Sequence, residues 1–172
     1  MKPFVVNVAD LLHRPAARRR ERLGGTLDGL KVGGSEVPAG AAVDVDTILE
    51  WVSDGILATG TVSAPWRGEC RRCLSTAGGT FDVAFRELFE SKPTEGESYQ
   101  LHHDFVDLEP LVSVAVLLEL PLAPLCAADC AGLCPTCGVD LNEGRCGCGT
   151  DEIDPRWAAL DILRTELAPG QE

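Results

Sequence analysis

The spacing of eight cysteines constrains the fold of this 172-residue chain more than any other feature of its sequence. Cys70 and Cys73 form a C-x-x-C pair, and the next 52 residues contain no cysteine. The other six are crowded into 23 residues, at Cys126, Cys130, Cys134, Cys137, Cys146 and Cys148. A C-x-x-C turn brings two sulfurs close enough to share one metal ion, and thiolates are soft ligands that favour zinc or iron. Eight thiolates are enough for two tetrahedral sites, so we expect two zinc ions.

The segment Cys134-Pro-Thr-Cys137-Gly138 gives the strongest local indication of a metal site. Its proline and glycine favour a tight turn in which backbone N–H groups face the sulfurs. Cys146 and Cys148 follow so closely that the intervening loop closes at low entropic cost. We therefore assign these four cysteines to one site. The second site takes those that are left, which are Cys70, Cys73, Cys126 and Cys130. Other partitions stay open because six of the cysteines are so close in sequence.

Two other uses of the cysteines compete with structural metal. Disulfides need an oxidising compartment, whereas residues 1–10 lack the charged start, apolar core and cleavage site of a signal peptide. No segment reaches the roughly 18 apolar residues of a membrane span. We therefore expect a cytoplasmic protein with reduced thiols, and redox-active or free thiols are the remaining alternative. His102 and His103 are weaker candidate ligands because eight cysteines already fill two sites.

The net charge of −12 disfavours broad, non-specific binding to nucleic acid. The charge is uneven, since residues 1–22 carry six basic and two acidic side chains. The arginines that could contact RNA phosphate are Arg14, Arg18, Arg19, Arg20, Arg22, Arg71 and Arg72. No aromatic residues interleave with the arginine run to stack on bases, so a solvated face is the simpler interpretation. Any contact with RNA is expected to be weak.

Hydrophobic patterning predicts an antiparallel sheet in the middle of the chain. Residues 4–8, 42–52 and 56–66 are strand-like apolar runs, and Ser53-Asp54-Gly55 between the last two indicates a hairpin. Alternation around residues 81–85 predicts a third strand, which places the Cys70/Cys73 turn at the end of a hairpin. Residues 10–23 suggest a short helix or an arm, and residues 23–40 and 91–103 suggest loops.

Two helices are expected after the sheet. The first begins at Asp107 as N-cap with Pro110 in the first turn, and an apolar face that includes Leu118. The second begins at Asp154 with Pro155 at the first helical position. We therefore predict an α+β fold that combines an antiparallel β-sheet with a few helices and a cysteine-rich, zinc-binding C-terminal module. The expected division is a strand and basic arm at 1–40, sheet plus helix at 41–125, and zinc module with helix at 126–172.

The sequence contains no recognisable catalytic constellation. A Gly-rich phosphate loop, an H-E-x-x-H motif and a G-x-S-x-G motif are all missing from it. A metal held by four cysteines has no open position for a reacting water. We therefore expect a protein that is not an enzyme and that has no small-molecule substrate.

Four segments together resemble one protein family. Cys70-Arg-Arg-Cys73-Leu74 resembles its C-x-R-C-L element, and residues 107–121 resemble its helix that ends in Leu-Glu-Leu-Pro. Residues 130–142, Cys-Ala-Gly-Leu-Cys-Pro-Thr-Cys-Gly-Val-Asp-Leu-Asn, resemble its C-x-G-L-C-P-x-C-G-x-x-L-N element, which is followed by C-x-C. Residues 154–160 resemble its closing D-P-R-x-A-x-L helix. The family is YceD, the large ribosomal RNA subunit accumulation proteins, and the resemblance covers about residues 40–167.

The resemblance implies a non-enzymatic bacterial factor for accumulation of large-subunit ribosomal RNA. Its partners would be the ribosome assembly or rRNA-processing machinery, and the acidic balance favours a basic ribosomal protein. Two alternatives stay open: a zinc-stapled protein interaction module without a ribosomal role, and a redox or iron protein, because C-P-x-C-G turns also resemble rubredoxin knuckles.

Overall fold

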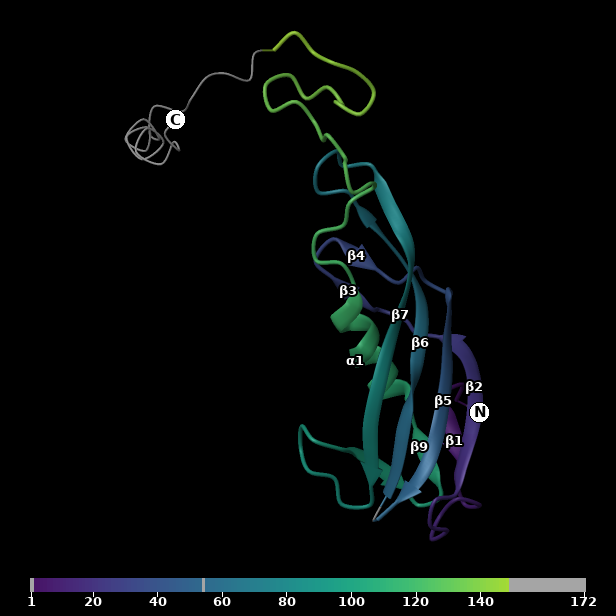
Figure 1. Ribbon diagram of the computed structural model, residues 1–172. Helices are drawn as coiled ribbons and strands as arrows, with labels where there is room; N and C mark the ends of the chain where they lie inside the picture. Colours follow the sequence, from purple (N-terminus) through teal and green to yellow (C-terminus); the bar gives the residue numbers. More distant parts are fainter. Residues whose placement is uncertain (1, 54, 149–172) are drawn as a thin grey trace, which may run out of the picture. The chain divides into compact units, whose positions relative to one another are not determined.

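The computed structural model describes residues 2–53 and 55–148, which contain nine strands and one helix. The chain divides into two compact units, residues 1–130 and 131–172. All of the named elements lie in the first unit (Figure 1). In chain order they are β1 (Val5–Asn7), β2 (Arg18–Thr26), β3 (Lys31–Val32), β4 (Ser35–Glu36), β5 (Ala42–Val52), β6 (Gly55–Glu69), β7 (Thr76–Glu90), β8 (Tyr99–His102), β9 (Phe105–Asp107) and α1 (Glu109–Glu119).

The centre of the sheet is the antiparallel meander β5–β6–β7, as predicted. Val52 lies opposite Gly55, which confirms the predicted hairpin between β5 and β6. In β5 the residues Val43, Val45 and Leu49 are buried while Asp44 and Ile48 between them are exposed. This period of two buries one face of the strand and leaves the other open.

Strand β6 is long enough to have two neighbours along one edge. Its residues 55–63 pair with β5, and Arg67 and Gly68 pair with β4. Its other edge pairs with β7 along the whole length, from Gly55 opposite Glu90 to Glu69 opposite Thr76. The far end of this hairpin therefore extends beyond β5 and carries the Cys70/Cys73 turn.

The prediction of a helix or arm over residues 10–23 was wrong. Residues 18–26 form β2, which pairs antiparallel with β5 from Arg18 opposite Glu50 to Thr26 opposite Ala42. The pairing satisfies the backbone along one edge of β2, and it places Arg20 and Arg22 beside Asp46, to which both donate hydrogen bonds. The prediction of a loop over residues 23–40 was also partly wrong, because the short hairpin β3–β4 lies there.

Three short strands complete the sheet beyond β7. Strand β8 runs parallel to β7, with Phe89 opposite Tyr99, and forms an antiparallel hairpin with β9. The predicted loop over 91–103 is therefore correct only for its first part. Strand β1 pairs antiparallel with β9, which confirms a strand within residues 4–8.

Helix α1 packs against one face of the strands (Figure 1). Its buried side chains are Leu111, Val112 and Val116, which join the core with Val62, Phe89 and other strand residues. The helix begins one residue later than a cap at Asp107 implies, with Leu108 as N-cap, although the Asp107 carboxylate does accept the Glu109 N–H at 3.0 Å. Leu118 was placed wrongly on the buried face, because it is 82% exposed.

The predicted fold class is confirmed only in part. The described residues are mostly sheet with a single helix rather than several. A cysteine-rich C-terminal region is present, as expected. The second predicted helix, from Asp154, lies outside the described residues.

Candidate metal centres

The first cysteine cluster lies at the turn between β6 and β7. Cys70 and Cys73 come from the turn itself, and Cys126 and Cys130 come from the chain that follows α1. The Sγ atoms of Cys70 and Cys130 are 3.8 Å apart, and those of Cys73 and Cys126 are 3.5 Å apart. All four sulfurs lie within 4.8 Å of one another. The sequence-based grouping of these four residues therefore matches their arrangement.

These separations fit four thiolates around one ion. A tetrahedral zinc with Zn–S bonds of about 2.3 Å places its sulfurs roughly 3.8 Å apart. A disulfide needs an S–S bond of about 2.05 Å, which is much shorter than the 3.5 Å and 3.8 Å that separate these sulfurs. The chemistry of the four sulfur donors suits zinc, and iron can use the same donor set.

Backbone N–H groups prepare the first cluster for thiolates. The amide of Cys73 and, more weakly, those of Cys126 and Arg72 lower the pKa of the Cys70 thiol to about 6. Hydrogen bonds with the sulfurs of Cys130 and Cys73 raise the pKa of Cys126 to about 12. One sulfur thus ionises easily while a neighbour holds its proton, which is the behaviour of thiols that share a charge in a small space.

Two hydrogen bonds hold the chain after α1 against this turn. The Arg71 N–H donates to the Pro124 carbonyl at 3.0 Å, and the Arg72 guanidinium donates to the Cys130 carbonyl at 2.8 Å. Leu74 closes the turn with a φ of 64°, a left-handed conformation that is uncommon outside glycine. Cys70, Cys73 and Cys130 are buried, and Cys126 is exposed.

The second cluster consists of Cys134, Cys137, Cys146 and Cys148, and it lies within the second unit. The Gly138 N–H donates to the Cys134 carbonyl at 2.9 Å, and Gly138 has a φ of 73°, so the glycine after the second cysteine makes the tight turn that the sequence predicted. The amides of Cys137 and Thr136 lower the pKa of Cys134 to about 6. The Cys137 side chain raises the pKa of Cys148 to about 12. The same pattern of one acidic thiol and one retained proton therefore recurs.

The two metal groups found among the described residues contain cysteines alone. His102 and His103, the weaker candidate ligands, lie at the β8–β9 turn and belong to neither group.

The candidate RNA-contacting arginines do not form one patch. Arg18, Arg20 and Arg22 lie on the exposed face of β2, where Arg20 and Arg22 are ion-paired with Asp46. Arg19 points the other way and pairs with Asp10 and Glu21. Arg22 pairs with Asp46 of β5, which in turn pairs with Thr61 of β6. Thr61 lies eight residues before the end of β6, so roughly 26 Å of strand separates the level of Arg22 from the turn that carries Arg71 and Arg72. Contact of these arginines with RNA stays a prediction.

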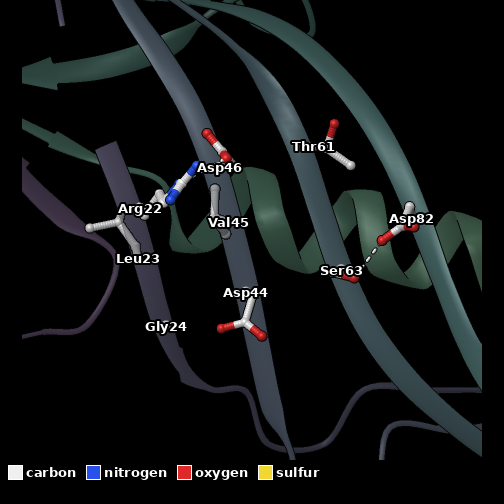
Figure 2. A pocket seen from close by; sticks show the side chains of 9 residues that line it. All are labelled: Arg22, Leu23, Gly24, Asp44, Val45, Asp46, Thr61, Ser63 and Asp82. Atoms are coloured by element: carbon white, nitrogen blue, oxygen red, sulfur yellow. Dashed lines mark hydrogen bonds and ion pairs between the residues drawn. The ribbon is translucent and has the colours of Figure 1, made fainter. Parts of the chain in front are cut away.

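A hollow that the sequence did not indicate lies on the exposed face of the sheet, opposite the buried residues of β5 (Figure 2). It has a volume of about 470 Å³, and side chains of β2, β5, β6 and β7 line it. Asp44, Asp46 and Asp82 face it, and Asp82 accepts a hydrogen bond from Ser63. Strand register alone brings these residues together, because Gly24, Asp44, Ser63 and Asp82 are successive partners across four strands.

Among the described residues, no helix is long and apolar enough to cross a membrane.

The sequence model of one protein family, described as large ribosomal RNA subunit accumulation protein YceD, matches residues 58–164. An uncharacterized protein of Mycobacterium tuberculosis is 42% identical over 168 residues, which cover 92% of this chain and 80% of that relative. An uncharacterized protein of Mycobacterium leprae is 36% identical, with 100% of this chain and 83% of the relative covered.

A relative from Arabidopsis thaliana carries a functional name, large ribosomal RNA subunit accumulation protein YCED homolog 1, chloroplastic. It is 32% identical over 62 residues, which cover 36% of this chain and 19% of that protein. No solved structure matches the chain.

Proposed function

Because the chain belongs to the family of YceD, the large ribosomal RNA subunit accumulation proteins, we propose that it is a non-enzymatic, zinc-binding factor that promotes accumulation of large-subunit ribosomal RNA and assembly of the ribosome. The observation that supports this most is the pair of four-cysteine clusters on a chain with this membership. Four thiolates fill the coordination sphere of zinc, which suits a scaffold and leaves no position for a catalytic water. The names in the family describe accumulation of an RNA and no reaction.

The eight cysteines would hold two zinc ions in this proposal, one in each cluster. The first ion would fix the β6–β7 turn to the chain after α1, and the second would fix the fold of residues 134–148. Iron in the same donor set, as in a rubredoxin-like redox protein, is the competing assignment. The two are separated by colour, since iron held by four thiolates is red and zinc is colourless.

The partners would belong to the ribosome assembly or rRNA-processing machinery of the cytoplasm. A net charge of −12 favours a basic ribosomal protein over direct contact with RNA. Arg14, Arg18 and Arg71 have neither an ion pair nor a side-chain hydrogen bond among the described residues, so they would be the arginines that reach phosphate, whereas the Arg72 guanidinium is held at the Cys130 carbonyl. Such contact would be weak and would fall as salt is added.

The deciding experiment measures ribosomal subunits in cells of the source organism. Deletion of the gene, or the double change Cys70→Ser and Cys73→Ser, is expected to lower mature large-subunit rRNA and the large-subunit peak on a sucrose gradient. The matched control is Thr76→Ser, which keeps all of the cysteines and alters only an exposed side chain at the start of β7, beside the same turn, and it should leave rRNA and subunit peaks normal. Normal rRNA and normal subunit peaks in a clean deletion would overturn the ribosomal role and leave a zinc-stapled interaction module.

A further inference from the structure

Helix α1 is apolar on every side. Only Glu109, Ser113 and Glu119 are polar among its eleven residues. A helix on the surface of a soluble protein normally shows one apolar stripe toward the core and polar residues on the opposite face, whereas a helix that is apolar all round is buried. The face of α1 that packs on the sheet uses Leu111, Val112 and Val116. The opposite face is expected to be polar, and it is not.

The open face of α1 carries a stripe of large apolar side chains. Pro110, Val114 and Leu118 follow one another at intervals of four residues, so they lie along one side of the helix. Val114 is 47% exposed and Leu118 is 82% exposed. Leu122, two residues beyond the C-cap, is 76% exposed. Single exposed leucines are common on proteins, but a continuous apolar row on one helix marks an interaction surface. We call Pro110, Val114, Leu118 and Leu122 the α1 stripe.

The segment of the chain that carries the α1 stripe is acidic. Residues 101–130 contain no lysine or arginine, and five of them are acidic. Lys2, from the N-terminus, is paired with Asp107 and Glu109. Glu119 is exposed and has no ion pair among the described residues. A second copy of this acidic chain would therefore bring like charges together at the stripe, whereas a basic partner would find opposite charges.

We propose that the α1 stripe binds a basic amphipathic segment of a partner protein, whose apolar side covers Val114, Leu118 and Leu122 and whose lysines or arginines lie near Glu119. An amphipathic helix on an apolar groove or face is a common mode of recognition, with anchors at helical spacing. The inference deepens the proposed function, on which it rests for its setting, by assigning the surface and the chemistry of the partner. Pro110, Val114 and Leu118 lie within α1, outside the segment 122–130 that the first metal centre would hold, and Leu122 is the first residue of that segment.

The test uses the purified, full-length, zinc-loaded protein and a synthetic probe. The probe is a fluorescent 18-residue amphipathic peptide with leucines on one helical face and lysines on the other, and the matched probe carries glutamate in place of every lysine. The lysine probe is expected to bind, and the glutamate probe to bind at least tenfold more weakly. Leu118→Glu should weaken binding of the lysine probe at least tenfold, since an anchor loses its burial and Leu118 is too exposed to matter for the fold.

The control for Leu118→Glu is Ile48→Thr. Ile48 is an apolar side chain of β5 that is 42% exposed on the other side of the sheet. Threonine keeps a β-branched residue in the strand. Its affinity for the lysine probe should equal that of the unaltered protein. Glu119→Gln should lower the affinity for the lysine probe two- to threefold at low salt, and it should reduce the dependence of that affinity on salt concentration. Equal binding of the probe by the unaltered protein and Leu118→Glu would overturn the inference.

A crosslinking experiment identifies the occupant. With p-benzoylphenylalanine in place of Leu118, illumination should join the protein to the lysine probe. A crosslink to a second copy, or to another part of the same chain, would overturn the inference. The outcome is separable from that of the proposed function, because a deletion strain with normal subunits refutes the ribosomal role whatever the probe does. If deletion lowers the large subunit but Leu118→Glu binds the lysine probe as well as the unaltered protein does, the proposed role of the α1 stripe is refuted and the ribosomal role stands.

Discussion

Removal of the first metal centre should release the chain after α1 while the sheet stays folded. The segment 122–130 has nine residues, and holding a residue in one conformation costs about 1–2 kcal/mol, so its order costs roughly 9–18 kcal/mol. Three hydrogen bonds, from the N–H groups of Arg71 and Cys130 and the side chain of Arg72, offset about 1.5–4.5 kcal/mol of this. A structural zinc supplies about 10–16 kcal/mol, which closes the difference.

The double change Cys70→Ser and Cys73→Ser should therefore free this segment. The core of the sheet contains no cysteine, so its cooperative unfolding should remain. Hydrogen exchange followed by mass spectrometry should show loss of amide protection in residues 122–130 and at the β6–β7 turn, with β5 and the adjoining half of β6 unchanged. Elemental analysis should show one zinc in place of two.

The matched control is the double change Cys134→Ser and Cys137→Ser in the other cluster. It should also remove one zinc, and it should loosen residues 131–148 while residues 122–130 stay protected. Unchanged protection of 122–130 in the first variant, or unaltered protein that contains no metal when purified under reducing conditions, would refute the reasoning.

Two further predictions concern the sheet. A Cβ atom on Gly60 would lie 2.2 Å from the Asp46 carbonyl oxygen and 2.8 Å from the Thr47 Cα. Gly60→Ala should therefore force β5 and β6 apart and lower the free energy of unfolding, measured by urea titration, by about 1–3 kcal/mol. The control Gly34→Ala, whose added Cβ would meet no atom within 4 Å, should leave the free energy of unfolding nearly unchanged. Hydrogen bonds from Arg20 lower the pKa of the Asp46 carboxyl in the folded protein. The stability that this ion pair adds is therefore fully present above the pKa of about 3.9 that an aspartate has in the unfolded chain, and it is lost as the pH falls through the lower pKa of Asp46 in the folded protein. Asp46→Asn should therefore flatten the acid side of a stability-against-pH curve, and a curve that is unchanged from that of the original protein would contradict the assignment.

The parts of the fold that depend on local pattern could be predicted from the sequence. The β5–β6 hairpin is adjacent in the chain and has alternating apolar residues on both sides of a turn. Ligand number and the short spacing in the C-terminal region favoured the two cysteine groups that the structure brings together, although the sequence left other partitions open. Neither required knowledge of distant contacts.

The parts that depend on distant contacts could not be predicted. Strand β2 has Leu23 as its only large apolar residue, and its structure comes from pairing with β5, whose partner residues lie 16 to 32 positions later in the sequence. The hollow at Asp44 and Asp82 exists only because strand register aligns them. Leu118 fits the helical period of the core, but α1 is apolar all round, so periodicity alone could not decide which side faces the sheet.

The pairing of β1 with β9 has a consequence for how the protein forms during synthesis. Val6 lies opposite Val106, so the partner of the first strand is made about a hundred residues later. At roughly 5–20 residues per second, the ribosome needs about 5–20 s to supply it. The β5–β6–β7 meander joins neighbours in sequence and can form within that interval. Strand β1, with the buried side chain of Val6, must therefore wait without its partner until β9 has been made.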